Sequence, residues 1–232
     1  KEGFFGKAED EYTRALHYEP ASAPALEARA RILVREGKPR RALEDMDELI
    51  GIVRDRPDYY MTRARIYVKL KDYQAALEDY GRVLSLSPGD DRVVKEKVLV
   101  YFKTNQPQKA LEGLSGYASK SGHDAEGRIL QARAHILLKH FDTAERILNE
   151  ALQVAPTYAP AYLYSGMVLM RRNRADEALS RLNRAIELDS SFAEAYKERA
   201  RIFISLGDLV RAAGDLTSAV NLDPADGELF AL

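Results

Sequence analysis

Apolar residues recur at steps of three and four along almost the whole chain, which is the periodicity of amphipathic α-helices. The patterned stretches are short, and the segments between them carry glycine, asparagine or lysine, as at Gly37, Asn105 and Lys71. Glycine and asparagine tolerate the left-handed backbone that closes a helix, whereas lysine at this point predicts slight strain. The pattern therefore predicts short helices joined by tight turns.

This pattern repeats every 34 residues without insertion or deletion. The sequence Ala-Leu-Glu-Asp occurs at 42–45 and at 76–79, and alanine recurs at the same step from end to end. Numbering that alanine as position 20 gives a half-repeat (1–22), six full repeats and the start of a further one (227–232). The recurring alanines are Ala8, Ala42, Ala76, Ala110, Ala144, Ala178 and Ala212. The full repeats are 23–56, 57–90, 91–124, 125–158, 159–192 and 193–226.

Other positions repeat as well. Position 8 is small in five repeats, position 27 is alanine in three, and position 32 is often proline. Small residues at positions 8 and 20 let two helices approach closely, and proline stops the second helix. Aromatic residues favour positions 4 and 11. These features resemble the tetratricopeptide repeat over nearly the whole chain. The resemblance implies an all-α fold, a right-handed α-solenoid or superhelix of antiparallel helix-turn-helix repeats.

Two features depart from a regular array. Repeat 91–124 carries Gly113 and Gly116 in its second half, and glycine inside a helix costs about 1 kcal/mol relative to alanine. We expect a short or irregular second helix there and the weakest point of the stack. The half-repeat 1–22 lacks its first helix, and repeat arrays usually end in polar caps. We therefore expect a segment of a longer protein, the alternative being a natural frayed cap.

Composition and motifs argue against catalysis. Basic and acidic residues number 35 and 36, so a general attraction to nucleic acid or to anionic membranes is not expected. There is no cysteine, and no stretch has the length of about 18 apolar residues that a membrane helix needs. His135 and His140 lie five residues apart, which is not the spacing of a helical zinc pair. We expect no enzyme activity, no cofactor, no metal and no membrane insertion by this segment. The sequence assigns no compartment, since cytoplasm and periplasm are both compatible.

Arginine at position 7 and aspartate at position 23 occur together or not at all. Position 7 is arginine in three repeats, and the same three repeats have aspartate sixteen residues later. This co-occurrence predicts an ion pair within each of those hairpins. The pairs are Arg29–Asp45, Arg63–Asp79 and Arg199–Asp215.

The resemblance also implies a concave surface lined by first helices, through positions such as 6, 9 and 13. In this sequence those positions are basic at one end and apolar in the next stretch. An exposed apolar cluster usually marks an interaction site, although packing between neighbouring helices would also explain these residues. The candidate partner-binding residues are Arg31, Arg35, Arg65, Lys69, Lys103, Leu130, Arg133, Leu137, Tyr164 and Met167.

The sequence thus favours a non-catalytic protein–protein interaction scaffold that binds a partner peptide or helix in the concave groove. The ligand expected from the groove chemistry is an acidic segment beside an apolar one. An alternative function is an assembly module that forms homo-oligomers through its stacked ends. Nucleic-acid binding is a weaker alternative, because the net charge of −1 supplies no electrostatic attraction.

Overall fold

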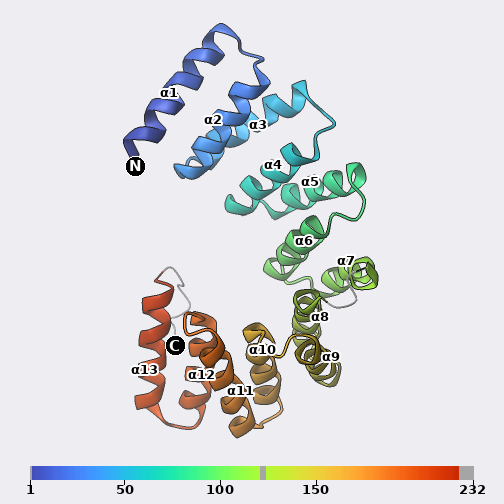
Figure 1. Ribbon diagram of the computed structural model, residues 1–232, viewed down its shortest axis with the longest axis vertical. Coiled ribbons are helices and arrows are strands. Elements are labelled where there is room, and N and C mark those ends of the chain that lie inside the picture. The colour runs from blue at the N-terminus through green and yellow to red at the C-terminus, as the bar shows by residue number, and fades with distance from the viewer. Residues whose placement is uncertain (1, 121–123, 225–232) are drawn as a thin grey trace. The chain divides into compact units, whose positions relative to one another are not determined.

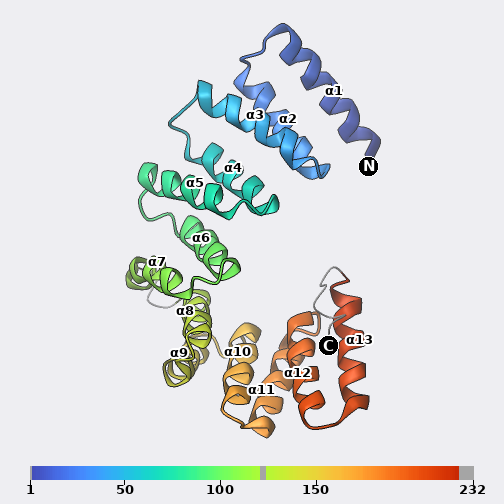
Figure 2. The ribbon, with the colours of Figure 1, turned by 180° about the vertical axis from the view of Figure 1, so that it is seen from behind.

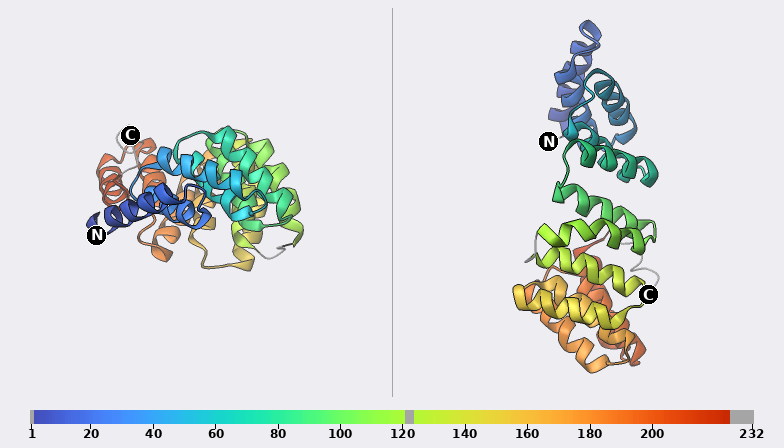
Figure 3. Two further views of the ribbon diagram at one scale, coloured as in Figure 1. Left: turned by 90° about the horizontal axis from the view of Figure 1, so that it is seen from above. Right: turned by 90° about the vertical axis from the view of Figure 1, so that its right-hand side faces the viewer.

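The computed structural model describes residues 2–120 and 124–224, which form helices joined by short turns (Figure 1). Figure 2 shows these helices from behind, and Figure 3 shows them from two further sides. Thirteen helices and no strand occur within the described ranges. The helices are α1 (Glu2–Tyr18), α2 (Ala23–Arg35), α3 (Pro39–Ile52), α4 (Pro57–Lys69), α5 (Tyr73–Leu86), α6 (Asp91–Lys103), α7 (Pro107–Lys120), α8 (Ala125–Leu137), α9 (Phe141–Val154), α10 (Ala159–Arg171), α11 (Ala175–Leu188), α12 (Ala193–Ser205) and α13 (Leu209–Leu222).

The chain divides into two compact units, and each is described by itself. Unit 1 comprises residues 1–106 with helices α1 to α6, and unit 2 comprises residues 107–232 with α7 to α13. The division falls between α6 and α7, inside the repeat 91–124 that carries the two unusual glycines.

Each full repeat contains two helices in the register set by the recurring alanine, and in the five repeats that lie within one unit these two helices pack together as a hairpin. The first helix always covers positions 1–13 and the second always covers positions 17–30. The alanines at position 20 are buried, as are the small residues at position 8. The prediction of an all-α array of antiparallel helix-turn-helix repeats is confirmed.

The half-repeat at the N-terminus forms α1, which packs on α2. Glu9 on α1 accepts hydrogen bonds from Lys38 at 2.7 Å and from Arg41 at 2.6 Å. These hydrogen bonds, the one from Lys38 above all, lower the pKa of Glu9 to about 2. Charged groups therefore link α1 to the hairpin that follows it.

The turns inside the hairpins all use a left-handed residue at position 15. Lysine adopts this conformation at Lys71 and Lys139, with φ of 62° and 61°. The amide after Lys71, that of Asp72, donates to the carbonyl of Tyr67 at 2.9 Å, which closes the helix in the Schellman manner. The sequence predicted this conformation for glycine and asparagine and strain for lysine, and all six turns adopt it. The residues are Gly37, Lys71, Asn105, Lys139, Asn173 and Gly207.

The prediction of a short or irregular second helix in repeat 91–124 is wrong. Helix α7 has 14 residues, as do the other second helices of the full repeats. Its Ala110, Leu114 and Tyr117 are buried. Packing of that face stabilises the helix, which outweighs the low propensity of its glycines.

A close approach between α7 and α8 depends on one glycine. Tyr117 stands at position 27, where the three following repeats have alanine. Gly127 on α8 faces it, and a Cβ added at Gly127 would lie 2.2 Å from Cε1 of Tyr117. The large ring and the missing side chain are therefore complementary.

The predicted arginine–aspartate pairs are confirmed in all three hairpins. Arg63 donates from Nε and Nη2 to the two carboxylate oxygens of Asp79, at 2.8 and 2.7 Å. Its Nη1 donates at 2.8 Å to Asp47, which lies at position 25 of the preceding repeat. These hydrogen bonds, that to Asp79 first, raise the pKa of Arg63 above its ordinary value. The arginine therefore links the two helices of its own hairpin and also the hairpin before it.

The other two pairs have the same geometry. Arg29 binds Asp45 at 3.0 and 2.7 Å, and Arg199 binds Asp215 at 2.7 Å through both nitrogens. In each case the remaining nitrogen donates to an oxygen at position 25 of the preceding repeat. These acceptors are Thr13 and Asn183.

Candidate functional site

Four of the six basic residues predicted to bind a partner meet in a cleft of unit 1. The cleft has a volume of about 230 Å³ and lies between α2 and α4. Four of its seven lining residues are cations, and the half-buried Val34 supplies apolar surface between them, above the buried Ile66. The lining is Arg31, Val34, Arg35, Thr62, Arg65, Ile66 and Lys69. We call this the basic cleft.

Three of the four cations of the basic cleft are exposed and weakly held. Arg31 lies 3.9 Å from Glu27, a distance too long for a strong ion pair. The guanidinium of Arg35 lies 6.0 Å from the ring centre of Phe5. Lys69 is exposed, and no ion pair joins it to any described residue. Arg31, Arg35 and Lys69 can therefore meet an incoming acidic group.

Arg65 differs, because the chain itself supplies its carboxylate. Its Nε donates to both oxygens of Glu96 on α6, at 3.0 and 3.1 Å, and its Nη2 also donates to Glu96. The hydroxyl of Tyr80 donates to the same carboxylate at 2.7 Å. Burial, and then this hydrogen bond, raises the pKa of Tyr80. The sequence did not predict that Arg65 would be held in this way.

Lys103 is exposed on α6 but does not line the basic cleft. The remaining candidate residues, from Leu130 to Met167, all belong to unit 2.

In unit 2 the predicted apolar group divides into buried and accessible residues. Leu130 and Tyr164 are only 7% and 8% exposed, and Tyr164 is part of the core. Burial raises the pKa of Tyr164. Leu137 is 45% exposed, and Met167 is half-buried. Of the two interpretations left open by the sequence, packing between neighbouring helices is the one that holds for Leu130 and Tyr164.

Arg133, the remaining candidate, is half-buried on α8. Arg133 lies close enough to Tyr164 to lower the pKa of its hydroxyl. Burial has the larger effect and raises that pKa. Arg133 is thus placed beside a core residue.

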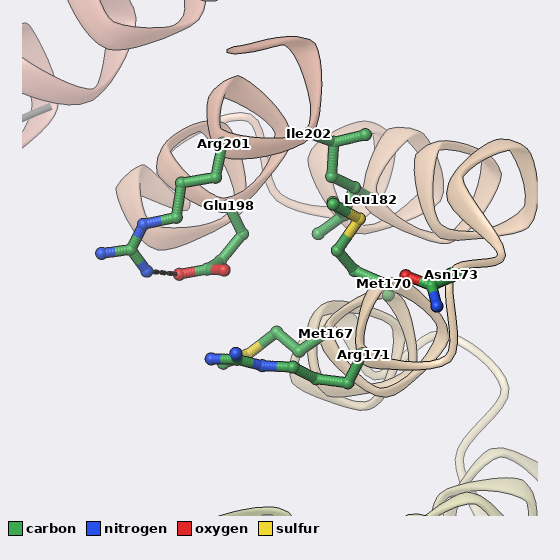
Figure 4. Close-up of a pocket in the computed structure, with 9 residues that line it drawn as sticks. Met167, Met170, Arg171, Asn173, Leu182, Glu198, Arg201 and Ile202 are labelled. Atoms are coloured by element: carbon green, nitrogen blue, oxygen red, sulfur yellow. Dashed lines mark hydrogen bonds and ion pairs between the residues drawn. The ribbon is translucent and has the colours of Figure 1, made fainter. Parts of the chain in front are cut away.

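A larger groove in unit 2 lies between α10 and α12 (Figure 4). Its volume is about 540 Å³, and α10 and α12 are in direct contact. Of the predicted residues it contains only Met167. The lining is Gly166, Met167, Met170, Arg171, Asn173, Leu182, Glu198, Arg201 and Ile202. We call this the methionine groove.

Sequence reasoning missed most of this groove. Glu198 and Arg201 occupy positions 6 and 9 of repeat 193–226, so the positions used for the earlier repeats would have found them. Met170 lies at position 12. Residues at this position also pack between neighbouring repeats, so the position alone does not indicate a binding site.

Among residues 2–120 and 124–224, no group of three or more histidine, aspartate or glutamate side chains has the arrangement of a metal site. In the same part of the chain, no helix combines the length and the apolar character needed to span a membrane.

Comparison with known families agrees with the geometry. Three tetratricopeptide repeat models match the chain, at residues 1–59, 57–90 and 135–202. The match at 57–90 coincides with one full repeat in the register derived from the alanines. The chain belongs to the tetratricopeptide repeat (TPR) family.

Solved structures support the same assignment of fold. A TPR protein from Parabacteroides merdae has a TM-score of 0.86 at 20% identity, over 99% of this chain and 91% of that one. A thermophilic TPR protein from Thermus thermophilus has a TM-score of 0.68 at 22% identity, over 76% and 96%. PilW, described as a type IV pilus biogenesis factor, has a TM-score of 0.68 at 16% identity, over 90% and 97%. No curated protein sequence matches the chain significantly.

The TPR fold typically serves as a scaffold for protein–protein interaction, and TPR proteins are generally non-catalytic. For this TPR array the fold therefore indicates a protein or peptide as the class of partner.

Proposed function

We propose that this TPR array is a non-catalytic scaffold that binds a peptide or helix of a partner protein in the concave groove lined by its first helices. The basic cleft between α2 and α4 carries the proposal. It brings three exposed cations, Arg31, Arg35 and Lys69, around the apolar surface of Val34.

The chemistry of the basic cleft selects an acidic segment with apolar residues. The planar fork of arginine holds a carboxylate through two hydrogen bonds, as Arg65 already does with Glu96. An apolar side chain of the partner would lie against Val34 and supply affinity. The charges would mainly set the association rate and would be screened by salt.

The test uses a capped synthetic peptide in which leucine and methionine are followed by glutamates. Arg35→Glu combined with Lys69→Glu should weaken its binding by about tenfold or more, through slower association, and should remove most of the salt dependence. Fluorescence anisotropy at several ionic strengths measures both effects. Arg65 is left unchanged, because a glutamate there would face the carboxylate of Glu96.

The control is Arg14→Glu combined with Arg40→Glu, which makes the same charge change at exposed residues outside the cleft. Equal weakening by both double variants would show a general charge effect and would contradict binding in the basic cleft.

A second candidate function is assembly into homo-oligomers through a stacked end. The turn between α12 and α13 exposes Leu206, Leu209 and Val210, by 53%, 66% and 85%. Light scattering at several protein concentrations distinguishes the two functions. A mass that rises with concentration, and no longer rises after Val210→Asp, would favour assembly.

A further inference from the structure

The methionine groove presents Met167 and Met170, both half-buried, above the buried side chains of Leu182 and Ile202. Met170 lies beside Leu182 and Ile202, and Met167 and Arg171 extend together from α10 (Figure 4). Glu198 and Arg201 lie across the opening on α12. The accessible apolar surface of the groove thus comes from the two methionines of α10, and charged groups lie at its rim.

The charges at the rim leave one cation uncompensated. Arg201 donates to Glu198, so these two opposite charges are already paired. Arg171 is exposed, and no ion pair links it to any residue of the described ranges. An incoming carboxylate would therefore be attracted to Arg171. The acidic groups nearby are Glu198, which is paired with Arg201, and the exposed Glu194 one turn earlier on α12.

The size and flexibility of the groove suit an inserted side chain. Its volume of about 540 Å³ falls within the range of about 300–1,000 Å³ typical of ligand pockets, whereas the 230 Å³ of the basic cleft does not. Methionine is unbranched and polarisable and adjusts to the shape of apolar partners. Two methionines on one wall therefore favour an aliphatic side chain of the ligand.

We infer that the methionine groove is a second docking site of this array, for a partner segment that carries a leucine- or methionine-like side chain next to a carboxylate. The aliphatic side chain would lie against Met167 and Met170, and the carboxylate would pair with Arg171. This inference rests on the proposed function, because it assigns a second site to the same scaffold.

The four methionines of the chain allow a direct test. Met46 and Met61 are buried in the core of unit 1, and Met167 and Met170 line the groove. Methionine methyl groups labelled with carbon-13 give one NMR signal each, which single Met→Leu variants assign. The leucine- and glutamate-containing peptide is titrated into the Arg35→Glu, Lys69→Glu variant, so that the basic cleft does not contribute. We expect the signals of Met167 and Met170 to shift and those of Met46 and Met61 to stay.

Arg171→Glu in the same background should weaken the titration by about tenfold, since an attractive charge becomes a repulsive one. Lys109→Glu, an exposed residue of α7 with the same change of charge, should leave it unchanged. A peptide with glutamine in place of glutamate should bind as weakly as the Arg171→Glu variant binds the original.

The outcomes separate this inference from the proposed function. If the unaltered array binds the peptide and the Met167 and Met170 signals stay fixed, the methionine groove is not a site, and the proposed function stands. Shifts of all four signals would indicate a change throughout the protein and would overturn local docking. No binding by the unaltered array would overturn both proposals.

Discussion

Replacing Asp79 by alanine should lower the free energy of unfolding by about 3 kcal/mol, the lower end of the range for breaking a buried ion pair. The substitution removes both carboxylate oxygens that Arg63 binds, and the side chain of Asp79 is only 7% exposed. Arg63 keeps its hydrogen bond to Asp47 and some contact with water, which limits the loss. Urea unfolding followed by circular dichroism measures the change.

The double-mutant cycle with Arg63→Ala isolates the pair. The coupling between Arg63 and Asp79 should be about 1–3 kcal/mol, above the value of about 0.2–1 kcal/mol typical of exposed pairs. Glu78→Ala, one residue away on α5 and exposed, should have little effect and is the control. Additive effects of Arg63→Ala and Asp79→Ala would show that the bidentate geometry contributes no stability.

Replacing Gly127 by alanine should destabilise the protein by about 1–3 kcal/mol, the usual cost of overpacking. The new Cβ would lie 2.2 Å from Cε1 of Tyr117, so the ring or the helix must shift. In a Tyr117→Ala background, Gly127→Ala should instead stabilise the protein. Alanine then improves helix propensity by up to about 1 kcal/mol, because the ring that it would meet is gone.

The change of Gly127→Ala from destabilising to stabilising, once the Tyr117 ring is removed, is the result that tests the contact. Thermal unfolding of the four proteins, unaltered, Gly127→Ala, Tyr117→Ala and the double variant, measures it. A destabilising effect of Gly127→Ala in both backgrounds would mean that Gly127 is required by the backbone of α8 and not by the ring of Tyr117.

The bounds of the hairpins could be predicted from the sequence because one small residue at a fixed step sets the register. The ion pairs could be predicted because both partners keep one residue type, arginine at position 7 and aspartate at position 23. Their third contact could not, since position 25 supplies its oxygen from three residue types. These acceptors are Thr13, Asp47 and Asn183.

The errors have local physical causes. Gly113 and Gly116 predict a short or irregular α7, but burial of Leu114 and Tyr117 stabilises that helix. The position of Tyr164 in the repeat is compatible with a groove or with packing, and its ring packs in the core. Arg65 was taken as available to a partner, although Glu96 of the next repeat already binds it. Contacts between repeats depend on the size and direction of side chains. The position of a residue within the repeat does not specify either, so these contacts could not be predicted from the register.

The central claim is that partner segments bind the first helices of the hairpins. Photo-cross-linking tests it most directly, with a diazirine-bearing leucine in the leucine- and glutamate-containing peptide and mass spectrometry to locate the attached residues. The account predicts cross-links on α2 and α4, and on α10 and α12, that an excess of unlabelled peptide abolishes. Competable cross-links confined to the second helices α3, α5 and α11 would contradict it.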